Sequence, residues 1–183
     1  MSTHVQQFNP LKPPKEQYGT IANYVNGEWI APRTERSLPI HNPATGEVIG
    51  TVPMTPKTEV EAAIEAAHEA FWEWRTTPPI VRARYLFKIK DQLEKHFEEI
   101  SRIATQEHGK CIDEARGETR RAIENVETAA GIPSLMMGYN LEDGAAKNID
   151  EMVVRQPLGV FGCVSPFNFP GMVPYWFWPY AIA

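Results

Sequence analysis

Apolar side chains recur at helical spacing in the segment that follows Thr55 and Pro56. A hydroxyl residue at the N-cap and a proline at the first helical position both favour a helix start, so a first helix is predicted from this point. Its apolar stripe is expected to face the core and consists of Ile64, Ala67, Phe71 and Trp74.

Two further helices are predicted between Pro79 and Pro133. One long helix should run from about Ile80 to Gly109, with an apolar side made of Leu86, Ile89, Leu93, Phe97, Ile100 and Ile103. The other should run from about Ile112 to Gly131, and its arginines alternate with glutamates three or four residues away. Most of these charges are therefore expected to form ion pairs on the helix surface.

Short β-prone segments lie on both sides of the helical region. Residues 24–30 contain an Asn-Gly turn between two such segments, which is typical of a β-hairpin. Residues 41–52 have a turn built on Pro43 and Gly46 that leads into a strand. Residues 149–156 form another strand candidate, after the turn at 143–146.

The last part of the chain, Gln156 to Ala183, carries a single short apolar run at Val160 to Val164. The run is bounded by Gly159 and Pro166, the pattern of a strand buried on both faces of a parallel sheet. Cys163 lies in this run, so a buried structural thiol is favoured over a nucleophile. A membrane span is the alternative for this uncharged stretch, but its prolines oppose one and favour a buried α/β core: Pro157, Pro166, Pro170, Pro174 and Pro179.

The composition of the chain limits the kinds of partner and site that it can have. The 183 residues have a net charge of -5 and no run of lysine or arginine, which argues against nucleic acid as a partner. The two cysteines are far apart and the histidines lack metal-ligand spacing, so we expect no disulfide, no metal and a reducing, cytoplasmic location. The first twenty residues are proline-containing and poor in apolar side chains, and we expect a flexible or surface-lying arm there.

Asn168 is the candidate for chemistry that the residues alone indicate. It lies between two phenylalanines in the turn after the apolar run, before a proline that can open a helix. Its neutral amide can donate hydrogen bonds to an oxygen that gains negative charge, as in acyl transfer or addition to an aldehyde.

The segment Gly159 to Pro170 resembles the first strand of the nucleotide domain and the Pro-aromatic-Asn-Phe-Pro turn of the aldehyde dehydrogenase superfamily. Residues 107–110, 114–118 and 121–138 resemble its CoA-acylating methylmalonate-semialdehyde dehydrogenase branch. The likeness runs from about Tyr24 to Ala183 and covers only the front part of that fold. It implies an α/β fold with β-hairpins, long helices, the start of a parallel Rossmann-like sheet and an oligomerisation arm strand.

The same resemblance implies four regions. Residues 1–20 would be the N-terminal arm, 21–142 the hairpins and helical layer of the NAD-binding domain, 143–157 the arm strand, and 158–183 the first strand and helix of the Rossmann-like sheet. The catalytic domain would be absent. An arm strand held outside its own domain needs a partner for its edge, which implies a homo-oligomer.

The resemblance also implies a reaction in which a semialdehyde, CoA and NAD give acyl-CoA, NADH and carbon dioxide. Ser165, Pro166 and Phe167 would line the nicotinamide end of the cofactor site, and Asn168 would donate to the oxyanion. Arg121 would receive the carboxylate of the substrate, a task that suits a planar guanidinium. On the residues alone, a surface ion pair is the favoured interpretation of Arg121.

The chain lacks other parts of the family's machinery. Its nucleophilic cysteine, general-base glutamate, ribose-binding lysine and glutamate and glycine-bearing phosphate loop have no counterpart here, and neither Cys111 nor Cys163 is at the nucleophile's position. We therefore expect no turnover from this chain alone. Two alternatives stay open: a hydrolytic aldehyde dehydrogenase without CoA, and a truncated, non-catalytic partner of full-length subunits.

Overall fold

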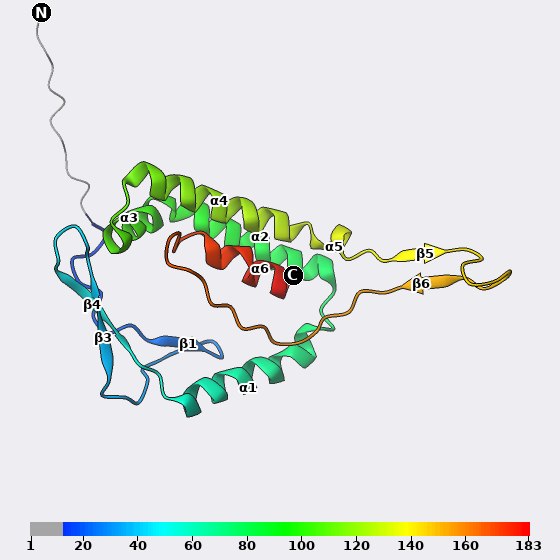
Figure 1. Cartoon of the computed structure of the whole chain (residues 1–183), viewed down its shortest axis with the longest axis horizontal. Helices are drawn as coiled ribbons and strands as arrows, with labels where there is room; N and C mark the ends of the chain where they lie inside the picture. Colours follow the sequence, from blue (N-terminus) through cyan, green and yellow to red (C-terminus); the bar gives the residue numbers. More distant parts are fainter. Residues whose placement is uncertain (1–12) are drawn as a thin grey trace, which may run out of the picture.

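A computed structural model describes residues 13–183, and its centre is a pair of helices that run side by side in opposite directions (Figure 1). These are α2 (Pro79–Lys95) and α4 (Ile112–Ala130). The C-terminal α6 (Trp178–Ile182) and the 3-10 turn η1 (Val173–Trp176) pack against them, with the short α5 (Ile132–Leu135) at the end of α4. The predicted helix at 112–131 is confirmed.

The core lies between α2, α4 and α6. Leu86, Ile123 and Val126 are fully buried there, because their spacing along each helix places them on the facing side. Arg82 is also buried and joins three segments. Its Nε donates to the Ala183 carbonyl at 2.5 Å, its Nη1 to the Thr77 carbonyl at 2.5 Å, and its Nη2 to the Met136 sulfur at 3.4 Å.

The long helix expected from Ile80 to Gly109 is two helices. The backbone leaves helical geometry at His96, with φ -102° and ψ 15°, and α3 (Phe97–His108) follows. The break turns α3 against α4, where the Ser101 and Thr119 hydroxyls, both buried, lie 3.0 Å apart. The expected end at Gly109 is confirmed: this residue is left-handed, with φ 86°.

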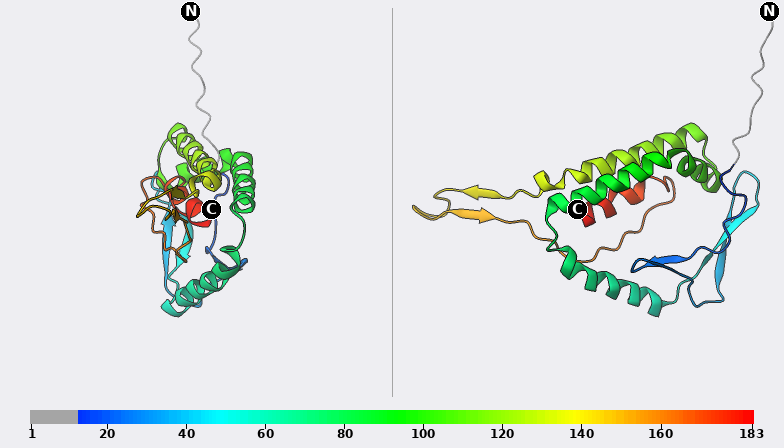
Figure 2. Two further views of the ribbon diagram at one scale, coloured as in Figure 1. Left: turned by 90° about the vertical axis from the view of Figure 1, so that its right-hand side faces the viewer. Right: turned by 180° about the vertical axis from the view of Figure 1, so that it is seen from behind.

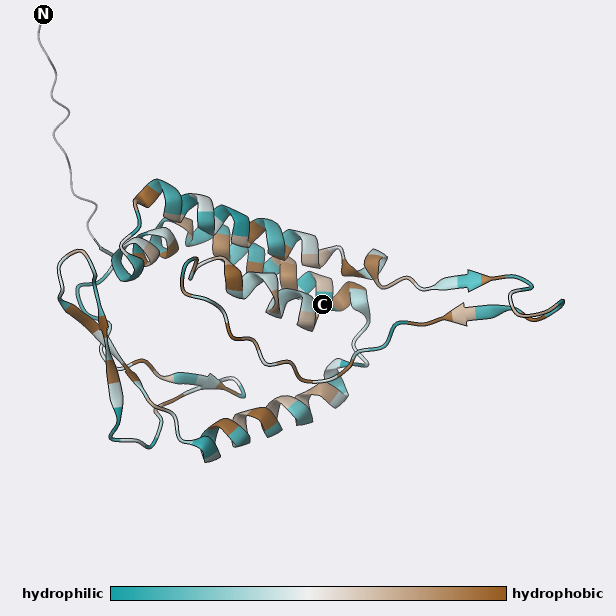
Figure 3. Ribbon diagram, viewed as in Figure 1, coloured by the Kyte–Doolittle hydropathy of each residue, from teal (hydrophilic) through white to brown (hydrophobic). Residues whose placement is uncertain are grey.

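The apolar stripe of the first helix does not face a core. This helix, α1 (Lys57–Trp74), has no buried residue, and Ile64 on its stripe is 54% exposed. The apolar positions along α1 are visible in Figure 3. Its two ends are tied down by hydrogen bonds: Glu59 in the first turn accepts from the Arg33 N–H at 3.1 Å, and the Trp74 indole Nε1 in the last turn donates to the Ile182 carbonyl at 2.8 Å. Thr55 makes no cap; its hydroxyl accepts from the Asn23 side chain instead.

Both N-terminal hairpins are formed. Strand β1 (Asn23–Val25) pairs with β2 (Glu28–Ile30), and β3 (Ser37–His41) pairs with β4 (Val48–Pro53), each antiparallel. Of the predicted arm at 1–20, residues 1–12 lie outside the described residues. Residues 13–20 run alongside β4 and are held at Tyr18. The N–H of Tyr18 donates to the Ile49 carbonyl and its hydroxyl donates to Gln106 on α3. This part of the arm therefore lies on the surface and is anchored.

A third hairpin projects away from the helices, as the right-hand view of Figure 2 shows. Its strands are β5 (Tyr139–Leu141) and β6 (Glu151–Val153), and all six residues are exposed. The strand candidate at 149–156 is therefore formed in its centre, and it pairs within its own chain.

The buried strand predicted at Val160 to Val164 is not formed. The segment is extended but has no strand partner among residues 13–183, and Val164 is 96% exposed. A parallel strand needs neighbours for its backbone groups and cover for both faces, and no described segment supplies either. The prediction that Cys163 is buried is wrong for the same reason, since Cys163 is exposed. Within residues 13–183, no helix is long and apolar enough to cross a membrane.

Candidate functional site

Asn168 and Arg121 line one pocket, where the turn after the extended segment meets α4. The pocket has a volume of about 330 Å³ and also includes residues from the end of α3 and the start of α4. Its lining is polar and charged, apart from one phenylalanine and one glycine: His108, Lys110, Glu114, Gly117, Glu118, Arg121, Asn168 and Phe169.

Helical spacing brings Arg121 to the pocket. Residues 114, 117, 118 and 121 are three or four positions apart on α4 and so share one face. Arg121 is exposed, and no carboxylate of residues 13–183 lies within ion-pair distance of it. A surface ion pair, the interpretation favoured by the residues alone, is therefore not what the structure has at this position.

The other two arginines of α4 are paired across helices. Arg116 contacts Glu98 of α3 at 2.8 Å and Arg120 contacts Glu94 of α2 at 2.6 Å, each through two nitrogens. These hydrogen bonds lower the pKa of both glutamates. Expected as pairs within one helix, they instead fasten α4 to its neighbours, and only Arg116 also has an intrahelical partner, Asp113.

The Asn168 side chain is exposed, and within the described residues its amide makes no hydrogen bond. Its backbone carbonyl accepts a hydrogen bond from Lys110 Nζ at 3.1 Å. The two amide donors are thus available to a ligand in the pocket.

Ser165 and Pro166 precede this turn, and Phe167 is its first residue. Phe167 packs its ring against His108 at 5.5 Å between centroids, which ties this segment to the end of α3. Ser165 lies with its hydroxyl 3.8 Å from the Cys163 sulfur, outside the pocket. The structure therefore groups Arg121 with Asn168, and leaves Ser165 and Pro166 on the exposed chain leading to them.

Lys110 and Glu118 are the site residues that sequence reasoning did not single out. Their side chains are only 5% and 0% exposed, and they form an ion pair beneath the turn. The pair spans the boundary between the loop and α4, so no helical spacing reveals it. Both residues occur in the segments on which the family resemblance rests, which was the available signal.

Glu107, beside the site, is a partly buried carboxyl without a partner in hydrogen-bond distance among residues 13–183. Burial raises the pKa of Glu107 above its usual value, and the adjacent His108 opposes that rise. The same part of the chain offers no metal site, since no three acidic, histidine or cysteine side chains of the described residues are grouped to hold one.

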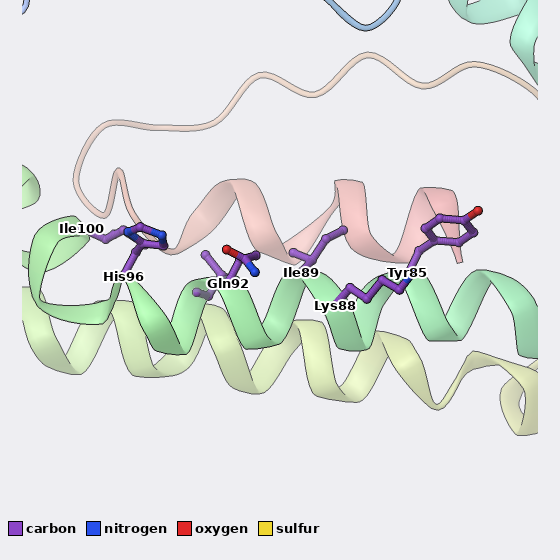
Figure 4. Close-up of a pocket in the computed structure, with 7 residues that line it drawn as sticks. Tyr85, Lys88, Ile89, Gln92, His96 and Ile100 are labelled. Atoms are coloured by element: carbon purple, nitrogen blue, oxygen red, sulfur yellow. The ribbon is translucent and has the colours of Figure 1, made fainter.

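A second, larger pocket lies away from this site. It has a volume of about 440 Å³ and lies along α2 and the start of α3 (Figure 4). Neither Arg121 nor Asn168 reaches it. Its lining is largely aliphatic and aromatic and consists of Tyr85, Lys88, Ile89, Gln92, Leu93, His96 and Ile100. Of these two pockets of the described residues, the smaller is the candidate functional site, because several polar groups converge in it.

Comparison with known proteins shows the family of the chain. Residues 29–183 match the model of the aldehyde dehydrogenase family. The chain belongs to that family. A malonate-semialdehyde dehydrogenase of Oceanobacillus iheyensis is 50% identical over 163 residues, which are 89% of this chain and 33% of that protein. The chain thus spans about a third of the length of the curated relatives it matches.

Solved aldehyde dehydrogenases share the fold of this third. The methylmalonate-semialdehyde dehydrogenase of Oceanimonas doudoroffii matches 90% of this chain and 33% of its own, with 44% identity and a TM-score of 0.85. A Sinorhizobium meliloti protein, assigned to methylmalonate-semialdehyde dehydrogenase and solved with NAD, covers 87% of this chain and 32% of its own at 39% identity and a TM-score of 0.82. The chain is therefore an α/β part of the aldehyde dehydrogenase fold.

Proposed function

We propose that this chain supplies the carboxylate-binding and oxyanion-stabilising part of an NAD-dependent, CoA-acylating malonate- or methylmalonate-semialdehyde dehydrogenase. The observation that carries the proposal is the shared pocket of Arg121 and Asn168. A semialdehyde has a carboxylate at one end and a carbonyl at the other, and the pocket offers one group suited to each. The names of the similar proteins support the same substrate class.

Arg121 is suited to the carboxylate. Its guanidinium is not neutralised by an acid of the described residues, unlike Arg116 and Arg120. A carboxylate ligand can therefore form the bidentate pair that those two arginines form with glutamates. Glu114 and Glu118 lie in the same lining, but Glu118 is already paired with Lys110, so its charge is compensated.

Asn168 is suited to the carbonyl oxygen. A preorganised amide donor stabilises negative charge as it develops, and the contribution of one such donor is about 10²- to 10³-fold in kcat. Because its amide makes no hydrogen bond to the described residues and its backbone is held by Lys110, the donor needs little rearrangement to act.

We propose that this chain also supplies one end of an NAD site. Ser165, Pro166 and Phe167 would line the nicotinamide end of NAD, which supplies the hydride acceptor when bound. The sequence has no Gly-x-Gly-x-x-Gly segment for the pyrophosphate. CoA would be the acyl acceptor.

We propose that these 183 residues by themselves do not turn over substrate. We also propose that the β5–β6 hairpin contacts another subunit in an assembled enzyme.

Carboxylate binding by the chain itself tests the proposal. Titration with propanoate, followed by NMR, should shift the Arg121 side-chain and Asn168 signals, whereas propanamide, its neutral analogue, should not. Arg121→Ala should abolish the shifts, and Arg84→Ala, which removes an exposed arginine outside the pocket, should leave them unchanged. Equal shifts with propanoate and propanamide would contradict the proposal.

Turnover separates the two reaction types. In a dehydrogenase that contains this chain, NADH formation from malonate semialdehyde should require CoA. NADH formation at the same rate without CoA would favour the hydrolytic alternative, which shares Asn168.

A further inference from the structure

We propose that Lys110 and Glu118 are positioning residues that hold the Asn168 turn against α4 through its backbone. Lys110 Nζ donates to one carboxylate oxygen of Glu118 and, at 3.1 Å, to the carbonyl of Asn168 itself. The other carboxylate oxygen of Glu118 accepts the N–H of Gly171. The two backbone contacts fall on either side of Phe169 and Pro170.

The pair is placed to define geometry more than to add stability. Both side chains are almost fully buried, and removing two charges from water costs about as much as their attraction returns. That cost is met only when the remaining donors and acceptors are satisfied, and here main-chain groups of the turn satisfy them. If the turn moved, the buried charges of Lys110 and Glu118 would lose their hydrogen bonds to the backbone of the turn, which costs free energy.

Two further contacts make the arrangement specific. Lys110 Nζ lies 4.4 Å from the centre of the Phe169 ring, a cation–π distance. Gly171 comes so close to α4 that a Cβ there would lie 3.3 Å from the Glu118 carboxylate. The chain before the turn has no strand partner among residues 13–183, so these contacts, with buried Met172 and Val173 and the Phe167 ring on His108, fix where Asn168 lies.

The catalytic meaning of this inference rests on the proposed function: the pair acts through Asn168 and does not itself contact substrate. Its structural content can be measured on the 183-residue chain without turnover. The Gly171 amide should exchange with solvent at least about tenfold more slowly, relative to its intrinsic rate, than the Gly162 amide of the exposed segment. Equal relative rates would overturn the inference.

Reversing the charges separates positioning from simple ion pairing. Lys110→Glu combined with Glu118→Lys keeps an ion pair, but a lysine at 118 cannot accept from Gly171 and a glutamate at 110 cannot donate to Asn168. Protection of Gly171 should fall to that of Gly162, and the Asn168 side-chain amide signals should move. Unchanged protection and unchanged Asn168 signals in the reversed chain would contradict the positioning role.

The matched control is another ion pair of α4. Arg120→Glu combined with Glu94→Arg reverses an exposed pair that touches no turn, and Gly171 and Asn168 should keep their wild-type signals. If circular dichroism shows that the Lys110–Glu118 reversal does not fold, the wild-type comparison of Gly171 with Gly162 decides alone. Propanoate binding is independent of both readouts: a protected Gly171 without propanoate binding keeps the positioning pair and rejects the proposed function.

Discussion

Arg121 and Asn168 line one pocket, although α4 carries the first and the turn before η1 carries the second. A cationic side chain without an acidic partner among residues 13–183 and an amide whose donors are unused by those residues therefore meet at a single site. The two groups are chemically independent, so their contributions can be separated by substitution.

Asn168→Ala should remove the oxyanion donor and leave the carboxylate site intact. In a dehydrogenase that contains this chain, we expect kcat to fall about 10²- to 10³-fold while KM changes little. In the 183-residue chain, the affinity for propanoate should be unchanged, because Arg121 provides it. Steady-state kinetics and an NMR titration measure the two effects. A weakened propanoate affinity with normal kcat would assign Asn168 to ground-state binding instead.

Leu86→Ala should strongly destabilise the chain, since Leu86 is fully buried between α2 and α4. Loss of its buried methyl groups and the cavity left behind should lower the free energy of unfolding by about 2–5 kcal/mol. Ile64→Ala is the control on α1, where the side chain is half exposed, and it should change stability by less than about 0.5 kcal/mol. Urea unfolding compares them. Equal losses would mean that the stripe of α1 is covered in solution.

Two glycine substitutions should have opposite signs. Gly109 has φ 86°, and a Cβ there would lie 2.7 Å from Pro43, so Gly109→Ala should destabilise the chain by more than about 1 kcal/mol. Gly117 is inside α4, and a Cβ added there would have nothing within 4 Å, so Gly117→Ala should stabilise the chain by about 0.5–1 kcal/mol. Thermal unfolding of the two variants gives the test, and a loss of stability in Gly117→Ala would count against the helix assignment there.

Glu107→Gln should raise stability at neutral pH. Burial raises the pKa of this carboxyl in the folded chain above its value in the unfolded chain. Between these two pKa values, the folded state therefore binds more protons than the unfolded state. The contribution of Glu107 to stability is therefore largest at acidic pH and is lost as the pH rises through the folded pKa. The variant should be more stable than the wild type at pH values above the folded pKa of Glu107, and equally stable below the unfolded pKa. Unfolding free energies measured from pH 4 to pH 8 would show this, and parallel curves would refute it.

The sequence was most informative where local signals agree with packing. The Asn26-Gly27 hairpin turn, the helix end at Gly109 and the helix at 112–131 each rest on local signals, and all three predictions are confirmed. The break at His96 has no proline or glycine to indicate it. It depends on how α3 packs on α4, a tertiary contact that periodicity does not encode.

The less successful predictions concern surfaces that need a partner. The stripe of α1 and the run at Val160 to Val164 have the pattern of buried elements, yet within residues 13–183 no residue of the stripe is buried and the run is exposed throughout. For the site, the residue types of Arg121 and Asn168 were readable from the chain, and their common pocket was not. The buried pair of Lys110 and Glu118 could be found only once the turn was seen against α4.

Arg82 links three segments around the helical layer. One guanidinium holds the loop before α2, the end of α6 and the residue after α5, so none of these three segments can detach without leaving a buried charge short of hydrogen bonds. Short terminal helices ordinarily fray independently. Here the three are expected to open together as one cooperative unit, and amide exchange should report a common opening free energy for them.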